Sequence, residues 1–249
     1  MEEIQTLIEI NPKFVLETIC GQYAWTIDQL SHFEKYLLWD KISLNQNMIW
    51  SERVIDCFSE RLDFRLGLPG NDAIVFTPQL IEKYKNKWDW MILTDNPNIP
   101  WSIELIEKYK DEWAWESYEF AGNLGLSSNH YLPWSEELLD KYIDKWFWGE
   151  LSSNPSLPWS LGLIRKYEDR WTWDGHYGLW GLSINPSPIV KEILAKYYPE
   201  RIDSKYRDFH IPVVSKNSNI IIDAVLRVFS KNIDKAEQIL SQLYTKNIL

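Results

Sequence analysis

Large apolar residues recur along the chain with a fixed period. Repeats of 25 to 33 residues begin at Trp25, Trp50, Phe76, Trp101, Trp134, Trp159 and Val190. We number each repeat from its first residue, which is position 0. Positions 0, 12 and 14 together hold 14 of the 15 tryptophans, and only Trp180 is out of phase. Position 8 is always Phe or Tyr. Self-similarity with such a period indicates supersecondary units that bury their apolar faces against neighbouring units.

The repeat that starts at Trp134 shows what each unit is expected to form. Ser135 is a good N-cap, and the two glutamates after it place negative charge at the positive end of a helix. Trp134 and Leu139 have the spacing of a hydrophobic staple. The stretch 146–155 predicts a shorter helix that ends at an Asn-Pro pair, because the residue before proline avoids the helical region. Each unit is therefore expected to be a helix of about three turns, a bend, a short helix and an extended return.

This pattern predicts an all-α fold: an α-solenoid of about 25-residue helix–turn–short-helix repeats with helical caps at both ends. Residues 1–24 are expected to form an N-terminal helical cap and residues 25–189 the tryptophan-rich repeats. Residues 190–249 are expected to hold a degenerate repeat and two capping helices, near 219–230 and 232–245. The last helix has one apolar face, which suits it to seal the end of the stack; its residues are Ile233, Ala236, Leu240, Leu243 and Tyr244.

Charge and cysteine content narrow the class of protein. The net charge is −10, and residues 189–249 carry +3, so the first 188 residues carry −13. An acidic body repels phosphate backbones, which argues against duplex nucleic acid as a partner. It favours basic protein partners, although excess acid also simply keeps proteins soluble. The two cysteines, Cys20 and Cys57, form no CxxC pair, so neither a disulfide framework nor a zinc site is predicted.

The chain has no stretch of the roughly 20 apolar residues that a membrane span requires. Its first residues are acidic where a signal peptide would be basic. We therefore expect a cytoplasmic protein without a membrane partner.

The motif Asn-Pro-x-Ile/Leu-Pro-Trp-Ser, preceded by Trp-x-Trp-x-x-Leu-Ser-x-Asn, resembles tandem tryptophan-rich repeats found in proteins of giant DNA viruses and of some bacteria. The resemblance covers residues 25–190 and is strongest in 88–101, 146–160 and 171–186. The unit length is also similar to that of leucine-rich-variant repeats, which alternate α- and 3₁₀-helices. The first likeness implies the type of repeat and the second implies its geometry; neither implies a catalytic activity.

Two repeats contain extra residues at the same place, directly after position 14. Eight extra residues lie within 116–125 and six within 174–181, so both insertions are expected on the same face of the stack. Insertions in repeat proteins often form the binding face, and aromatic side chains suit such a face. The alternative is that they only cover neighbouring helices. The candidate binding residues in and beside the insertions are Tyr118, Phe120, His130, Tyr131, His176, Tyr177 and Trp180.

The residues that recur in phase have a structural interpretation. The tryptophan row is expected to be core rather than a ligand groove, because the same positions accept Phe, Leu and Val. The asparagine that closes each repeat is expected to form a turn through its side chain. A basic row before position 8 is expected to be neutralised by adjacent acids; its lysines are Lys83, Lys108, Lys141 and Lys166, and the acids are Glu82, Glu107 and Asp140.

Motifs of enzymes are missing from the sequence: there is no GxSxG, no phosphate-binding loop and no HExxH. The leading hypothesis is a non-enzymatic protein that binds a protein partner through its concave or insertion face, with no cofactor and no metal. The second is a protein that sequesters a small aromatic or nucleotide-like ligand, in keeping with the viral resemblance. A third, an enzyme that uses His130, His176 and nearby carboxylates, has no substrate to support it.

Overall fold

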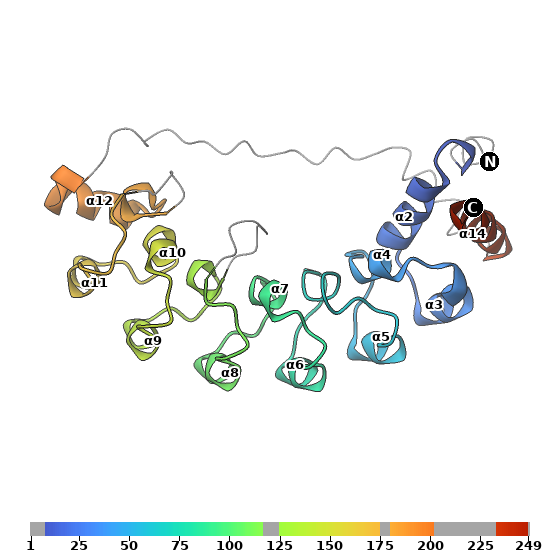
Figure 1. Cartoon of the computed structure of the whole chain (residues 1–249), viewed down its shortest axis with the longest axis horizontal. Coiled ribbons are helices and arrows are strands. Elements are labelled where there is room, and N and C mark those ends of the chain that lie inside the picture. The colour runs from blue at the N-terminus through green and yellow to red at the C-terminus, as the bar shows by residue number, and fades with distance from the viewer. Residues whose placement is uncertain (1–7, 117–124, 175–179, 202–232, 249) are drawn as a thin grey trace. The chain divides into compact units, whose positions relative to one another are not determined.

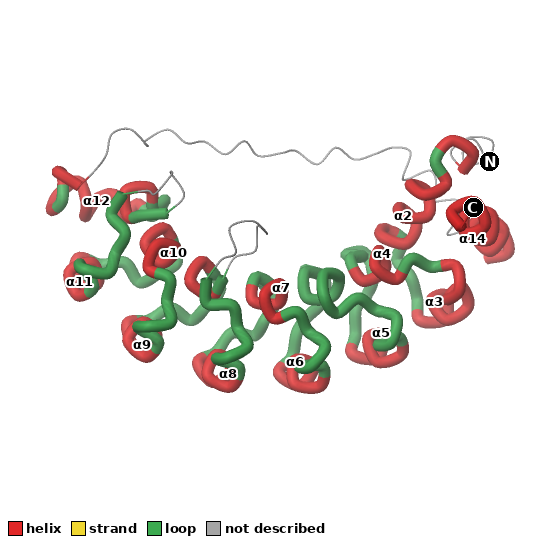
Figure 2. Tube along the Cα trace, viewed as in Figure 1, coloured by secondary structure: helices red, strands yellow, loops and turns green. Residues whose placement is uncertain are grey.

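The computed structural model describes residues 8–116, 125–174, 180–201 and 233–248 (Figure 1). Every regular element in these ranges is an α- or 3₁₀-helix, and no described residue belongs to a β-strand (Figure 2). The predicted all-α class is confirmed. Packing divides the chain into two compact bodies, residues 1–89 with 214–249 and residues 90–213.

Each body contains several short helices. The first body contains α2 (Pro12–Gln22), α3 (Ile27–Phe33), η1 (Glu34–Tyr36), α4 (Trp39–Ser43), α5 (Glu52–Cys57), α6 (Pro78–Lys83) and α14 (Ile233–Ile248). The second contains α7 (Trp90–Thr94), α8 (Ile103–Lys108), η2 (Leu126–Ser128), α9 (Glu136–Lys141), α10 (Trp148–Ser153), α11 (Leu161–Lys166), η3 (Leu182–Ile184), α12 (Pro188–Tyr197) and η4 (Pro199–Arg201). In the second body α8, α9 and α11 follow one another in one row, and α7 and α10 lie in another (Figure 1).

The helices that start the repeats begin where the sequence predicts, at a hydroxyl cap. The Ser135 hydroxyl accepts a hydrogen bond from the Leu138 backbone N–H at 3.1 Å, which satisfies one of the unpaired donors of the first turn. Five other repeats use the same arrangement, with caps at Thr26, Ser51, Thr77, Ser102 and Ser160.

These first helices are shorter than the three turns predicted. Helix α9 ends at Lys141, because Tyr142 has φ −122° and ψ 31°, outside the α-helical region. A hydrogen-bonded turn, with the Lys145 N–H donating to the Tyr142 carbonyl at 2.8 Å, then leads to Trp146. The aromatic residue at position 8 therefore marks the end of the helix, whereas the apolar periodicity alone suggested that the helix continued.

Aromatic rings of successive repeats interlock. The Trp115 ring at position 14 lies 4.9 Å from the Tyr142 ring and 4.8 Å from the Trp146 ring of the next repeat. Trp148 packs in the same way against Tyr167 and Trp171, at 5.1 and 4.9 Å. In the first body Phe64 lies 4.9 Å from both Tyr84 and Trp88. Ring pairs at these distances and tilts are favourable. The position-12 tryptophans are buried, as the core interpretation predicts, whereas the position-14 tryptophans are half-buried.

The asparagine that closes each repeat joins that repeat to the one before it. Asn154 is 2% exposed, and its Oδ1 accepts from the Ser156 N–H at 2.9 Å, the local turn that the sequence predicted. Its Nδ2 donates to the carbonyls of Ser127 and Asn129, both at 3.2 Å. Asn185 repeats these contacts with Ser152 and Asn154. One buried amide thus satisfies backbone groups on both sides of the junction between repeats.

A buried hydroxyl two residues before the asparagine makes a second link. The Ser152 hydroxyl donates to the Trp148 carbonyl at 2.6 Å and accepts from the Thr172 backbone N–H of the next repeat at 2.9 Å. The hydroxyls of Ser43, Thr94 and Ser127 also accept a backbone N–H from the following repeat. Ser or Thr is therefore favoured here because a hydroxyl both donates and accepts.

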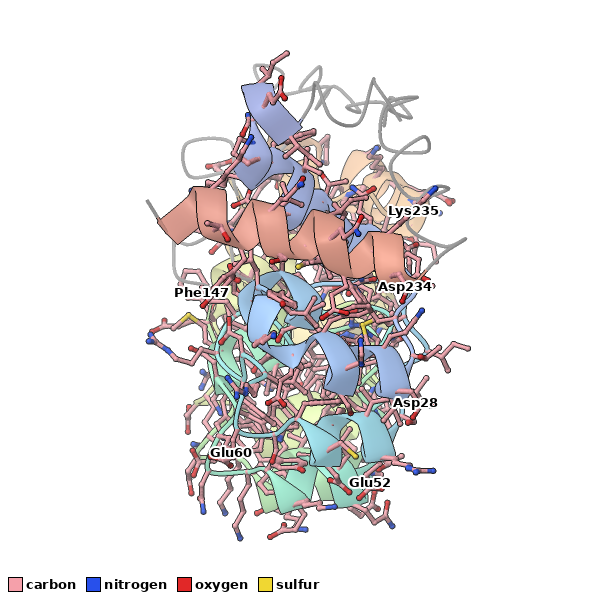
Figure 3. The ribbon with its side chains drawn as sticks, turned by 90° about the vertical axis from the view of Figure 1, so that its right-hand side faces the viewer. Asp28, Glu52, Glu60, Phe147, Asp234 and Lys235 are labelled. Atoms are coloured by element: carbon pink, nitrogen blue, oxygen red, sulfur yellow. The ribbon has the colours of Figure 1, made fainter. Side chains whose placement is uncertain are left out.

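The C-terminal helix α14 packs on the N-terminal helix α2 and on η1, within the first body (Figures 1 and 3). Its buried residues include Ala236, Leu240 and Leu243, as its apolar face predicted. The Tyr244 ring is 38% exposed and lies 5.9 Å from the Tyr36 ring. The sequence suggested that this helix seals the end of the stack, and the surface that it covers is α2. The helix predicted near 219–230 lies outside the described residues.

We expect Asn154→Ala to lower the free energy of unfolding by about 3 kcal/mol, because it leaves two buried carbonyls and one backbone N–H without their partner. Urea denaturation monitored by circular dichroism measures the change. Ser156→Ala is the matched control; it removes an exposed hydroxyl and keeps the backbone N–H, so it is expected to change stability by less than about 0.5 kcal/mol. Equal stabilities of the two variants would contradict the structural role of the asparagine.

Candidate functional site

The two insertions leave their repeats at equivalent points of the second body. One hydrogen bond joins the two ends of the first insertion: the Leu126 N–H donates to the Ala114 carbonyl at 2.7 Å. The equivalent bond joins the ends of the second insertion: the Leu182 N–H donates to the Thr172 carbonyl at 2.9 Å. A second backbone hydrogen bond follows at each insertion. The Ser127 N–H donates to the Trp115 carbonyl at 3.2 Å, and the Ser183 N–H donates to the Trp173 carbonyl at 3.1 Å. The ends of both insertions are therefore held by the same local geometry.

A glycine closes each insertion, for two different reasons. A Cβ at Gly125 would lie 2.5 Å from the Glu116 carbonyl carbon, so only glycine lets the two backbones approach this closely. Gly181 has φ 142°, a conformation that residues with a side chain rarely adopt. The insertions thus return to the repeat through positions where a side chain is not tolerated.

Trp180, the out-of-phase tryptophan, packs beside helix α10. Its ring is half-buried and lies edge-to-face on the Phe147 ring, with centroids 5.3 Å apart. A Cβ at Gly149 would be 3.3 Å from two Phe147 ring carbons and 3.6 Å from the Trp180 Cβ. Part of the role of Trp180 is therefore to cover α10, as the packing alternative predicted, and the ring also keeps exposed area.

Two further residues of α10 belong to this region and were not singled out from the sequence. The Glu150 side chain is 1% exposed, which is unusual for a carboxylate. Gly149 and Glu150 stand where α7 has Met91 and Ile92. These two positions hold a different pair in other repeats as well, Asp40 and Lys41 for example, so the repeat pattern carries no signal for them. We define the α10 site as Phe147, Gly149, Glu150 and Trp180; Figure 3 marks the position of Phe147.

The other candidate residues do not belong to the α10 site. His130 and Tyr131 lie on the loop between η2 and α9, both exposed, and Tyr131 is 59% exposed. The Tyr131 backbone N–H donates to Asn129 Oδ1 at 2.7 Å, so this loop is shaped by the repeated asparagine turn. The remaining candidates, Tyr118, Phe120, His176 and Tyr177, lie outside the described residues.

The lysines before position 8 form ion pairs with acids of the preceding repeat. Lys166 Nζ lies 2.7 Å from Asp140 and 3.4 Å from Glu136. Lys83 reaches Asp56 and Glu52 at 2.7 and 3.1 Å. The Tyr167 hydroxyl also donates to Asp140, at 2.8 Å. Acids do pair with these lysines, but they come from the preceding repeat and not from the adjacent positions that the sequence suggested.

These contacts shift the pKa values of the groups involved. Hydrogen bonds from Lys110, Tyr142 and Lys141 lower the pKa of Glu107 to about 2. Burial, reinforced by the hydrogen bond to Asp56, raises the pKa of Tyr84 to about 12. Both shifts hold the group in the protonation state that its partner needs at neutral pH, as in an ion-pair network.

A second set of cations stands at position 11 and lies over the position-14 ring of the preceding repeat. Lys145 Nζ lies 5.4 Å from the Trp115 ring centroid, and the guanidinium of Arg170 lies 5.6 Å from that of Trp148. Each cation also pairs with an acid of that repeat, Asp111 or Asp144. In the first body Lys87 pairs with Glu60 on the side of the ribbon opposite to Glu52, so the two ion-pair rows run along different edges (Figure 3).

In the described part of the chain, no group of three or more His, Cys, Asp or Glu side chains could hold a metal ion. Burial raises the pKa of the Cys20 thiol to about 12, which makes it a poor nucleophile. No helix of the described ranges combines the length and the apolarity that crossing a bilayer demands.

Comparison of the chain with protein-family models, with characterised proteins and with solved structures gave no match. The site therefore has to be interpreted from its own geometry.

Gly149→Ala is expected to shift the indole NMR resonance of Trp180, because the new methyl group meets the Phe147 ring at 3.3 Å. Gly162→Ala is the matched control in α11, where the nearest atom, Ser160 Oγ, is 3.6 Å away. We expect this control to stabilise the protein by about 0.5 to 1 kcal/mol and the Gly149 change to give no such gain. An unmoved Trp180 resonance in Gly149→Ala would show that the packing at α10 is looser than described.

The Glu107 carboxyl is expected to titrate near pH 2 in a ¹³C NMR titration. Its folded pKa lies below the ordinary 4.5, so its contribution to stability is fully present above pH 4.5 and is lost as the pH falls towards 2. Lys110→Met removes the largest cause of the shift and should raise the pKa of Glu107. Lys145→Met, whose acid partner is Asp111, should leave the Glu107 carboxyl unchanged, and an equal effect of both would contradict the assignment.

Proposed function

We propose that the repeats within each body form an α-solenoid, in which each repeat stacks on the one before it. The support is positional: within each body, equivalent residues of successive repeats make equivalent contacts. The asparagine amide, the buried hydroxyl, the position-14 ring and the position-11 cation all reach the neighbouring repeat. Contacts mainly between nearest neighbours are the defining property of solenoid proteins.

We further propose that this protein is a non-enzymatic, cytoplasmic scaffold that binds a protein partner through its insertion face. One observation carries the proposal: the repeated side chains are engaged in contacts between repeats, whereas the α10 site departs from the repeat. The asparagines and several of the lysines and tyrosines that recur in phase bond to the neighbouring repeat. Side chains committed in this way are not available to a ligand, so binding falls to the insertions and the residues beneath them.

The insertion ends also have the rigidity that a binding surface requires. Paired backbone hydrogen bonds, the tightly approached Gly125 and the positive-φ Gly181 fix where the insertions start and end. Variable segments on a rigid scaffold are the usual arrangement of binding surfaces in repeat proteins. The half-buried Trp180 supplies aromatic area of the kind that binding hot spots use. The excess of acid in the first 188 residues favours a basic partner.

Quantitative affinity purification with the wild type and with Trp180→Ala tests this proposal. We expect Trp180→Ala to lose a partner that the wild type retains, with a decrease in affinity of at least about tenfold, as for a hot-spot residue. Val75→Ala, which truncates another apolar side chain that is 74% exposed in the first body, is the matched control and should retain the partner. Identical partner profiles for all three proteins, with unchanged circular dichroism, would refute binding through Trp180.

The small-ligand hypothesis predicts a different result in a parallel experiment. A nucleotide that stacks on the α10 site would raise the melting temperature of the wild type and not that of Trp180→Ala, since binding to the folded state stabilises it. We expect no such shift across a panel of nucleotides. A reproducible, concentration-dependent shift would replace the protein-binding proposal with ligand sequestration.

A further inference from the structure

The ion-pair row between repeats is replaced at the last junction of the second body. One junction earlier, the lysine at position 7 pairs with an acid at position 6 of the preceding repeat: Lys166 Nζ lies 2.7 Å from Asp140. Where the Trp159 and Val190 repeats meet, position 6 is Arg165 and position 7 is Tyr197. A base therefore stands at the position of the acid, and an aromatic ring stands at the position of the lysine.

Two cations meet at the Tyr197 ring. The guanidinium carbon of Arg165 lies 5.9 Å from the ring centroid, and Lys196 Nζ lies 5.1 Å from it. Arg165 belongs to α11 and Lys196 to α12, and both residues are exposed. The ring face attracts each cation but carries no formal charge, so it does not neutralise them.

Within the described part of the chain, neither Arg165 nor Lys196 forms an ion pair. Lys166, the neighbour of Arg165, is already paired with Asp140 and Glu136. Acids that lie within four residues of the two cations in the sequence form no ion pair with the described residues either; they are Glu168, Asp169, Glu192 and Glu200. This junction therefore carries positive charge in a protein whose net charge is −10.

The tyrosine at position 8 adds a hydroxyl to the same junction. One repeat earlier the Tyr167 hydroxyl donates to the position-6 acid, Asp140, at 2.8 Å. Tyr198 is the equivalent tyrosine, and its ring lies 4.9 Å from the Trp173 ring, as the Tyr167 ring lies 5.1 Å from that of Trp148. The ring is placed as in the earlier repeat, but the carboxylate that would accept from its hydroxyl is replaced by an arginine.

We propose that Arg165, Lys196 and the Tyr198 hydroxyl form a binding site for an aspartate or glutamate side chain of an acidic protein segment. The incoming carboxylate takes the part that Asp140 plays one junction earlier, because it accepts from the tyrosine hydroxyl and pairs with the bases. A guanidinium suits this role, since its geometry matches a carboxylate. A basic segment is repelled, so the site selects by charge. This inference goes beyond the proposed function, because it involves neither insertion and takes a partner of the opposite charge.

The test uses the full-length protein and the peptide acetyl-Gly-Glu-Glu-Gly-amide, with the glutamine peptide as its uncharged equivalent. The backbone ¹⁵N–¹H resonance of Tyr197 is followed during titration. We expect a saturable shift with the glutamate peptide and none with the glutamine peptide. Arg165→Asp supplies the carboxylate from the chain itself and should weaken binding by at least about tenfold. Arg53→Asp is the matched control, because it makes the same charge change at an exposed position of α5, and it should bind as the wild type does.

Tyr198→Phe separates binding from folding. It should weaken peptide binding and leave the urea midpoint of unfolding unchanged, because the hydroxyl forms no hydrogen bond with the described residues. Tyr167→Phe removes a donor to Asp140 and should lower that midpoint without weakening peptide binding.

An unmoved Tyr197 resonance, or equal binding by the wild type, Arg165→Asp and Tyr198→Phe, would overturn the proposed site. Tighter binding of inorganic phosphate than of the glutamate peptide would overturn the assignment of the ligand as a carboxylate. Trp180→Ala should leave the peptide titration unchanged, so failure at the insertion face and failure at this site give different results.

Discussion

The structure depends on the buried asparagine at the end of each repeat, whose side chain hydrogen-bonds to the backbone of its own repeat and to that of the preceding one. Its Oδ1 closes a turn within its own repeat, and its Nδ2 donates to carbonyls of the repeat before it. Helices of six residues leave many backbone groups unpaired at their ends, and those groups have to find partners elsewhere. The asparagine and the buried hydroxyl provide them, which explains how such short helices can surround a core of tryptophan and tyrosine.

Much of this arrangement follows from the sequence, because caps, turns and apolar periodicity are local signals. The serine caps and the asparagine turns are found where those signals place them. Contacts to another repeat are not local, so periodicity revealed the asparagine as a turn former but not the carbonyls that it reaches. The apolar face of α14 indicated that it packs, and only the structure shows that it packs on α2. Phe147 and Glu150 were missed because their positions vary from repeat to repeat and so carry no periodic signal.

Repetition also limits where a ligand can bind. A position that every repeat uses for stacking is selected for the neighbour that it touches, and its chemistry is set by that contact. The lysine and tyrosine rows show this, since their charges and hydroxyls end on acids of the preceding repeat. Residues that depart from the pattern, such as the out-of-phase Trp180, do not make a contact that every repeat needs. Departures from the repeat are therefore the best guide to where the proposed binding surface lies.

The packing of α14 on α2 has a consequence for how the protein is made. Helix α2 leaves the ribosome early, and the whole second body is synthesised before α14 follows. During that interval the surface of α2 that α14 later covers stays open to water or to a chaperone. Completion of the first body thus has to wait for synthesis of the second, and a product truncated before Ile233 would leave the apolar surface of α2 that α14 covers exposed.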